Sequence, residues 1–83
     1  MSIYPDPVQG SASFTYTVDR EGPVTVLLTD LDGKPVQTIV QNENQKPGRY
    51  RQEIYFDSDV NPGHYWITFK TCAIKAGLRI TKE

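Results

Sequence analysis

The chain has 83 residues, which is room for one small domain. Its 9 Lys and Arg against 10 Asp and Glu give a net charge of −1 at pH 7. This balance indicates neither a nucleic-acid partner nor binding to an anionic membrane. Only 37% of the residues are hydrophobic, and the single cysteine, Cys72, excludes a disulfide within the chain. No apolar run approaches the roughly 18 residues that a membrane-spanning helix needs.

The choice of apolar and hydroxyl residues favours β-structure. Val, Ile, Thr and the aromatic residues number 30, whereas Ala, Leu and Met together number 8. β-Branched and aromatic side chains fit a pleated surface and lose rotamer freedom in a helix. No segment keeps a 3.6-residue hydrophobic period, so we expect an all-β domain without a helix.

Three strands are expected in the first half of the chain. Apolar and polar residues alternate over residues 14–18 and again over 24–29, with Gly22-Pro23 as the break between them. The second run stops at Asp30-Leu31-Asp32-Gly33, where Asp-Gly predicts a tight hairpin turn, and Val36–Val40 is the returning strand. Alternation assigns to the core Phe14, Tyr16, Val18, Val24, Val26 and Leu28.

Three more strands are expected in the second half. Residues 41–48 have no periodicity and are predicted to be a polar loop. A strand over residues 49–56 follows, although Gln52 interrupts its apolar face. The long turn of residues 57–63 leads to the last two strands. The core face of the three strands is assigned to Tyr50, Ile54, Phe56, Tyr65, Ile67, Phe69, Ala76, Leu78 and Ile80.

Turn signals about every ten residues predict an immunoglobulin-like, two-sheet antiparallel sandwich. The sandwich has six strands, or seven if residues 2–5 also pair. No internal repeat divides the chain, and only the first three residues are a candidate linker. We therefore expect residues 1–83 to form a single domain.

Few residues point to catalysis or metal binding. His64 is the only histidine and is expected on the solvent side of a strand, without the nucleophile and carboxylate of a triad. Cys72 has no basic neighbour and is expected to be half-buried and inert. Asp57, Asp59 and Asn61 have the 1-3-5 spacing of a calcium loop, but the glycine falls one position late, at Gly63, and Thr68 stands where such a loop has a bidentate glutamate. An ordinary turn is favoured, and no catalytic residue, metal or cofactor is expected.

Two aromatic residues depart from the core pattern. Tyr55 and Trp66 have the opposite parity from the core residues of their strands, so both are expected on outer faces. Exposed aromatic rings can stack on sugars or anchor a protein partner. These two residues are therefore the candidates for a binding surface.

The order of motifs along the chain resembles a known family. Tyr4-Pro5-Asp6-Pro7-Val8-Gln9-Gly10 resembles the Y-P-N-P-x-x-G opening of the type A C-terminal sorting domains of type IX secretion substrates. The later features that resemble the family are, in order, Val24-x-Val26, Asp30-x-x-Gly33, Pro47-Gly48, Gly63-x-Tyr65 and a short closing strand from Leu78 to Lys82. The immunoglobulin-like domain of flagellar hook-cap proteins is similar in much of this pattern.

The resemblance implies a non-catalytic domain that is the C-terminal part of a larger secreted protein. Secretion machinery would recognise it in the periplasm and move the N-terminal cargo across the outer membrane, to the cell surface or the medium. The resemblance also implies a sortase-like peptidase that cleaves the domain after export. The start of the chain shows no secretory signal, which is then expected at the front of the cargo. Neither nucleic-acid binding nor direct membrane insertion is implied.

The residues that carry the resemblance are the candidate recognition residues, namely Pro5, Asp6, Pro7, Gly10, Gly63, Tyr65, Leu78, Ile80 and Lys82. The two prolines are expected to stop the first strand, and the two glycines to supply turns. Exposed strand edges accept partner strands, so the strand from Leu78 to Lys82 is the expected docking element. Whether two copies associate weakly stays open.

Two alternatives to a sorting domain remain. One is an accessory module that binds carbohydrate or another surface through Tyr55 and Trp66. The other is a structural spacer that packs beside an enzyme domain. Loss of glycan binding in Trp66→Ala would favour the first, and an internal position next to an enzyme domain would favour the second.

Overall fold

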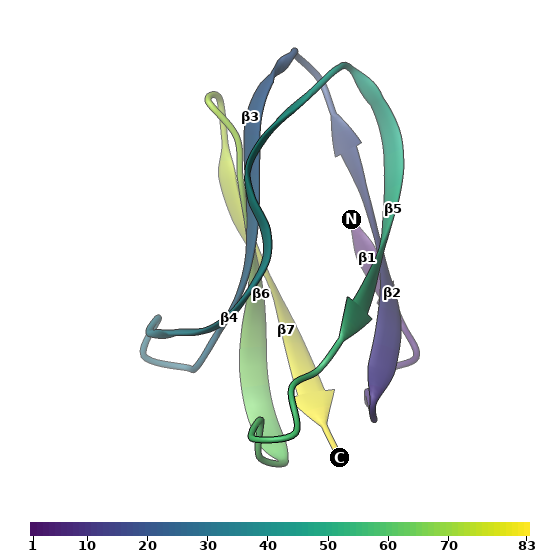
Figure 1. The fold of residues 1–83 in the computed structure, drawn as a ribbon, viewed down its shortest axis with the longest axis vertical. Coiled ribbons are helices and arrows are strands. Elements are labelled where there is room, and N and C mark those ends of the chain that lie inside the picture. The colour runs from purple at the N-terminus through teal and green to yellow at the C-terminus, as the bar shows by residue number, and fades with distance from the viewer.

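The computed structural model describes residues 1–83 and consists of seven β-strands joined by turns (Figure 1). The strands are β1 (Ser2–Tyr4), β2 (Ser11–Val18), β3 (Gly22–Thr29), β4 (Pro35–Gln45), β5 (Gly48–Tyr55), β6 (Gly63–Lys70) and β7 (Lys75–Lys82). Residues 2–4 therefore do pair, so the first three residues are not a linker. No helix is long and apolar enough to cross a membrane.

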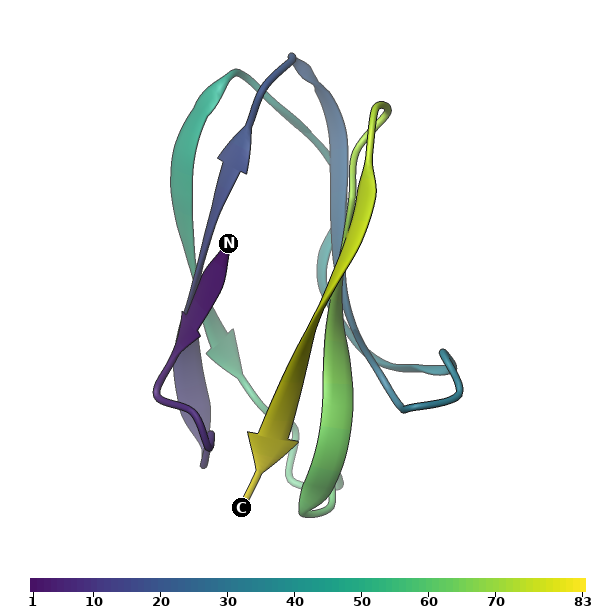
Figure 2. The same cartoon turned by 180° about the vertical axis from the view of Figure 1, so that it is seen from behind.

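The strands form two antiparallel sheets, which confirms the predicted sandwich. One sheet has the order β1-β2-β5 and the other the order β4-β3-β6-β7. The two sheets face each other across the core, as both views show (Figures 1 and 2). The chain crosses between the sheets from β2 to β3, from β4 to β5 and from β5 to β6.

The core lies between the sheets and contains the residues that alternation predicts except Ala76, which is half-buried and lies outside the hydrophobic cluster. Phe14, Tyr16 and Val18 from β2 are buried, and they face residues of β3 and β6. The Tyr16 ring lies at the centre of an aromatic cluster, with its centroid 5.4 Å from that of Phe14, 5.5 Å from that of Tyr50 and 5.0 Å from that of Phe69. Each such pair contributes about 1 kcal/mol beyond the burial of its apolar area.

Strand β4 is longer than the sequence predicts. The loop expected over residues 41–48 is wrong up to Gln45, because these polar residues pair with the beginning of β3. The register shifts opposite Thr25, where Asn42 has a φ of 49° and donates its backbone N–H to the Thr25 hydroxyl at 3.1 Å. This bulge inserts an extra residue and turns Gln45 into the core. The hydrophobic pattern does not indicate this extension of β4, because residues 41–44 are exposed on an edge strand and are all polar.

Two further residues, Gln52 and Cys72, need comment on their burial. Gln52, which interrupts the apolar face of β5, is half-buried, and its side-chain amide donates to the Glu53 carbonyl at 3.0 Å. Cys72 is exposed, so the prediction of a half-buried thiol is wrong. It lies in the turn between β6 and β7, where the Thr71 hydroxyl accepts the backbone N–H groups of residues 73 and 74 at 3.1 and 3.0 Å. This local bonding holds the turn outside the core.

The hairpin turn between β3 and β4 is confirmed. The Asp30 carboxylate accepts the backbone N–H groups of Asp32 and Lys34, both at 2.9 Å. Gly33 donates its N–H to the Asp30 carbonyl at 3.0 Å and has a φ of 87°. A residue with a Cβ adopts that conformation only with strain, which explains the glycine.

Candidate functional site

Most of the candidate recognition residues meet at one end of the sandwich. We call this region the motif end and define it as Pro5–Gly10, Asn61–Tyr65 and Ile80–Glu83. It is the lower end in Figure 1, where the C-terminus and the start of β6 lie together. Residues about 75 positions apart in the sequence are therefore neighbours there.

Val8 joins the opening motif to the closing strand. Its N–H donates to the Thr81 carbonyl at 2.8 Å, and its carbonyl accepts the N–H of Glu83 at 2.8 Å. The Asp6 carboxylate lies 3.5 Å from the N–H of Thr81. Val8 itself is completely buried in the core. The opening motif thus binds the outer edge of β7 at its C-terminal end through a short parallel bridge.

The prolines and the first glycine surround Val8 without entering the core. Pro5, Asp6 and Pro7 are exposed, and β1 ends before them at Tyr4, as expected. Gly10 accepts a hydrogen bond from the N–H of Phe56 at 3.1 Å through its carbonyl. No atom lies within 4 Å of a Cβ placed at this position, and its φ is not in the left-handed region. The expectation that a turn requires glycine here is therefore wrong.

The start of β6 forms the other side of the motif end. Gly63 pairs with Lys82, and Tyr65 pairs with Ile80. Gly63 has a φ of 153°, which disfavours any residue with a Cβ. The half-buried Tyr65 ring packs against the core, and its hydroxyl donates to the Asn61 carbonyl at 2.6 Å. This bond ties the turn that precedes β6 to the strand itself.

Strand β7 is one of the two edge strands of the four-stranded sheet, and Val8 covers part of its outer edge. Ile80 is buried, Leu78 packs against the core, and Lys82 is half-buried. Backbone groups of an antiparallel edge strand alternate between the partner strand and the outside. Since Thr81 and Glu83 bond outward to Val8, the outward groups along the rest of β7 belong to Lys75, Gly77 and Arg79. The exposed edge is therefore Lys75–Arg79, whereas the end of the predicted element Leu78–Lys82 is covered.

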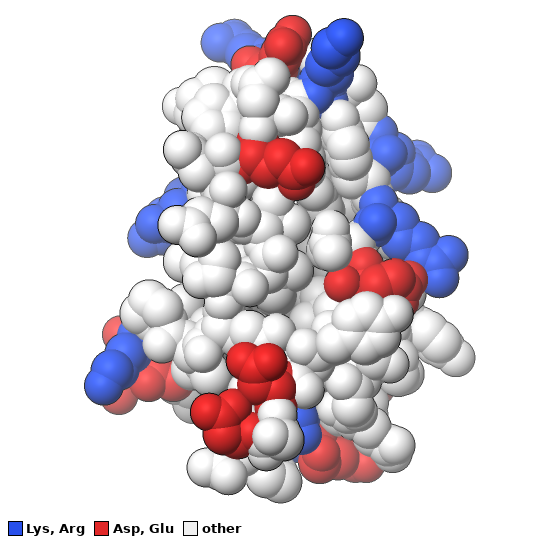
Figure 3. Space-filling model, in the orientation of Figure 1, with Lys and Arg blue, Asp and Glu red and all other residues white.

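The exposed edge of β7 has a positive charge. Between Asp59 and Glu83 the chain contains only basic ionisable side chains besides His64, Tyr65 and Cys72, namely Lys70, Lys75, Arg79 and Lys82. None of these four side chains forms an ion pair, because the one salt bridge of the chain joins Arg51 and Glu53 at 3.1 Å. Side chains of both signs occur on the face that Figure 3 shows, where most of the acidic ones lie in the lower half. The basic hairpin is thus a local feature of a nearly neutral domain.

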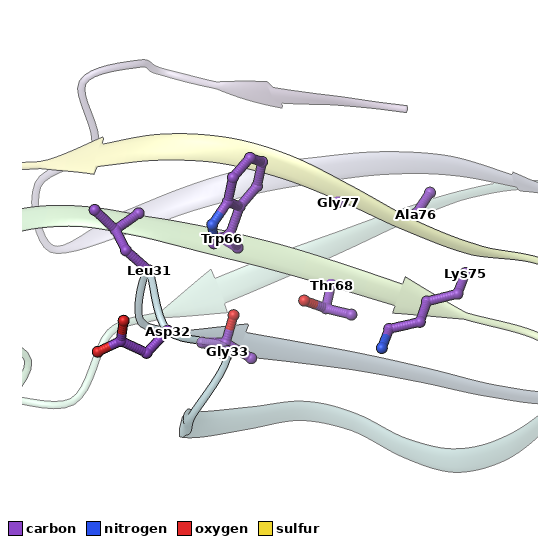
Figure 4. Close-up of a pocket in the computed structure, with 9 residues that line it drawn as sticks. Leu31, Asp32, Gly33, Trp66, Thr68, Lys75, Ala76 and Gly77 are labelled. Carbon is purple, nitrogen blue, oxygen red and sulfur yellow. The ribbon is translucent and has the colours of Figure 1, made fainter.

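The two outward aromatic residues do not form a common platform. Tyr55 is 72% exposed on β5, in the three-stranded sheet. Trp66 lies on the outer face of β6, in the other sheet, and is half-buried. Its six-membered ring lies over Gly77, where a Cβ would come within 3.3 Å of Cε3 (Figure 4). Gly77 was not predicted as a site residue, because only the pairing of β6 with β7 reveals its role.

The residues considered for metal binding and catalysis lie in ordinary local structures. Asp57 accepts the N–H of Val60 at 3.0 Å through its carbonyl, so residues 57–61 form part of a turn, as expected. No group of three or more His, Cys, Asp or Glu side chains that could hold a metal ion is present. His64 is exposed, and its Nδ1 lies 3.1 Å from the Thr81 hydroxyl.

Comparison with known proteins agrees with the arrangement of these motifs. Neither the curated proteins nor the solved structures contain a match to the chain. A family model described as the secretion system C-terminal sorting domain matches residues 2–82, which include the whole motif end except Glu83. The expected resemblance is therefore confirmed. The chain belongs to the family of C-terminal sorting domains of type IX secretion.

Proposed function

We propose that this domain is a detachable sorting signal whose β7 edge is the element that the secretion machinery binds. Membership of the sorting-domain family supports the general function, which is export of an attached protein to the cell surface or the medium. The finer proposal rests mainly on one observation. Strand β7 has an exposed basic edge at Lys75–Arg79, while its last residues are held by Val8.

The two parts of β7 have different tasks in this proposal. The bridge to Val8 fixes the position of the strand relative to the rest of the sandwich. The outward N–H and C=O groups of Gly77 and Arg79 then offer a template to which a strand of the partner can pair. The ammonium and guanidinium groups of Lys75 and Arg79 favour a partner strand with acidic residues.

The fate of the cargo follows from the same proposal. The cargo is joined to the N-terminal side of the domain and crosses the periplasm before the outer membrane. A sortase-like peptidase then removes the domain, and the cargo stays at the surface or is released. The family of sorting domains is non-catalytic in general, so the proposal assigns no chemical step to this chain. Mass measurement of an exported fusion would show whether the domain has been removed.

Substitution of Arg79 tests the edge without removing a core residue. A cargo carrying a secretory signal is fused to residues 1–83 and expressed in a bacterium with a type IX system. Arg79→Pro removes an outward N–H, a position where edge strands tolerate proline. Export of this variant is expected to fall about tenfold, as for the loss of about 1.4 kcal/mol of binding. Arg79→Glu, which reverses the charge, is expected to reduce export as well.

Arg49→Glu provides the matched control, since Arg49 is an exposed arginine of β5 in the opposite sheet. It is expected to leave export unchanged. Thermal unfolding of the isolated variants shows whether each still folds. Normal export of a folded Arg79→Pro variant, or equal loss with Arg49→Glu, would contradict docking at the β7 edge.

A further inference from the structure

The outer face of the four-stranded sheet carries a groove of about 400 Å³ beside Trp66. Its floor is formed by β3, β6 and β7, and the turn between β3 and β4 rises at one end. Figure 4 shows Leu31 and Asp32 of this turn on one side of the indole and Lys75 at the far end. The groove is separate from the motif end, but it shares Lys75 and Gly77 with the β7 edge that the proposed function assigns to docking.

Trp66 gives the groove an apolar plate. The indole is half-buried and rests on β7 because residue 77 is a glycine. A Cβ at that position would lie 3.3 Å from Cε3 of the ring, so the ring would have to shift by a few tenths of an ångström. The indole N–H has no hydrogen-bond partner within the chain. It is not fully buried, because no fully buried side-chain nitrogen lacks a partner. The plate is therefore positioned by the sheet and has a free donor at its edge.

Unpaired polar groups surround this plate. Thr29, which pairs with Trp66 across the sheet, is only 4% exposed, and its hydroxyl makes no hydrogen bond within the chain. Since no fully buried side-chain oxygen lacks a partner, this hydroxyl keeps some exposure to solvent, and Thr29 lines the groove. Thr68, Asp32 and Lys75 also line the groove. The hydroxyl, carboxylate and ammonium groups of these three residues bond to no side chain or backbone group of the protein.

We propose that this groove binds a neutral saccharide of one or two hexopyranose rings. The C–H face of such a ring is apolar and stacks on an indole, while its edge carries hydroxyls that both donate and accept. Residues with matching groups line the groove beside the indole, namely Thr29 and Thr68 with hydroxyls, Asp32 with a carboxylate and Lys75 with an ammonium. Its volume lies at the small end of the usual range for ligand sites, which suits one or two sugar rings.

A purely apolar protein side chain would fit this groove less well. It would cover the Thr29 hydroxyl without replacing its bonds to water, and a buried polar group without a partner costs free energy. The polar groups therefore favour a sugar over an aliphatic or aromatic anchor of a partner protein.

Because Trp66 is the only tryptophan, its indole N–H gives a single signal that reports on the groove. We would titrate the 83-residue chain with cellobiose, mannobiose and lactose separately and follow the ¹⁵N–¹H spectrum. At least one disaccharide is expected to shift the indole signal and the amides of Thr68 and Gly77 in a saturable way. Absence of such a shift with all three sugars would overturn the proposal.

Three variants locate the binding site. Thr68→Val keeps the shape and the indole but removes one hydroxyl, so the affinity is expected to fall about fivefold. Trp66→Ala, followed through the Gly77 amide, is expected to weaken binding about tenfold. Tyr55→Ala removes an exposed aromatic ring on the opposite sheet and should leave the affinity unchanged. Equal weakening by Tyr55→Ala and Thr68→Val in folded proteins would show that the sugar does not bind in the groove.

Discussion

The Tyr16 hydroxyl connects the aromatic core to a buried polar side chain at the edge of the other sheet. It donates to Oε1 of Gln45 at 3.0 Å, and Gln45 in turn donates to the Glu43 carboxylate at 3.2 Å. Gln45 is 8% exposed and reaches this position only because of the bulge in β4. One phenol thus joins β2 of the first sheet to β4 of the second.

Tyr16→Phe is expected to destabilise the domain by about 1–2 kcal/mol near neutral pH, because it leaves the side-chain oxygen Oε1 of Gln45 without its donor. The ring remains, so the aromatic contacts are kept. Burial also raises the pKa of the Tyr16 phenol above its ordinary value of 10.0. Below pH 10 the phenol is neutral in both states and its contribution to the free energy of unfolding is complete. This contribution is lost as the pH rises through the higher pKa of the folded state.

Urea unfolding at several pH values measures both effects. The wild type is expected to lose stability above pH 10 more steeply than Tyr16→Phe, so that the difference between the two proteins narrows. If the difference in unfolding free energy between the wild type and Tyr16→Phe stays constant from neutral to alkaline pH, burial of the phenol does not cause the loss of stability above pH 10.

The edge strands of the sandwich differ in how much of their length is covered by other segments. The short β1 covers only residues 13–15 of β2, and the opening motif then crosses to β7 and bonds to its last residues. The edge of β7 before this bridge stays open. The opening motif and the closing strand are thus parts of one structural unit, although the whole domain separates them in sequence.

Val8→Ala tests how strongly this unit is held. Val8 is fully buried, so removing two methyl groups is expected to cost about 2 kcal/mol of unfolding free energy. The amide of Glu83, which bonds to Val8, should also exchange its hydrogen faster. Val36→Ala is the matched control, because Val36 is 40% exposed on β4 and its truncation should cost less than about 0.5 kcal/mol. Similar costs for the two variants would mean that the opening motif is not anchored.

For the whole molecule, local alternation was enough to predict most strands and the core. Phe14, Tyr16 and Val18 show their inward face directly in the sequence, and the Asp-Gly turn shows where β3 ends. The extension of β4 was missed because an edge strand of polar residues has no apolar period. Its strand character comes from pairing with β3 and from the bulge at Asn42, which are long-range effects.

The candidate site was predictable as a set of residues but not as an arrangement. The motifs at the two ends of the chain were identified from the sequence, whereas the bonds between Val8 and β7 depend on the closed sandwich. The same holds for Gly77, whose role becomes visible only once β7 lies beside Trp66. The sequence therefore identifies the motifs, whereas strand pairing decides which of their backbone groups have no hydrogen-bond partner within the domain.

We infer that these 83 residues form a sorting domain that can direct an attached protein out of the cell. The most direct measurement fuses residues 1–83 to the C-terminal end of an unrelated periplasmic enzyme and compares its activity in the periplasm, at the cell surface and in the medium. In a bacterium with a type IX system, the enzyme is expected outside the outer membrane. In a bacterium that lacks this system, the enzyme is expected to stay in the periplasm. Retention of a folded fusion in the periplasm of the competent bacterium would contradict the claim.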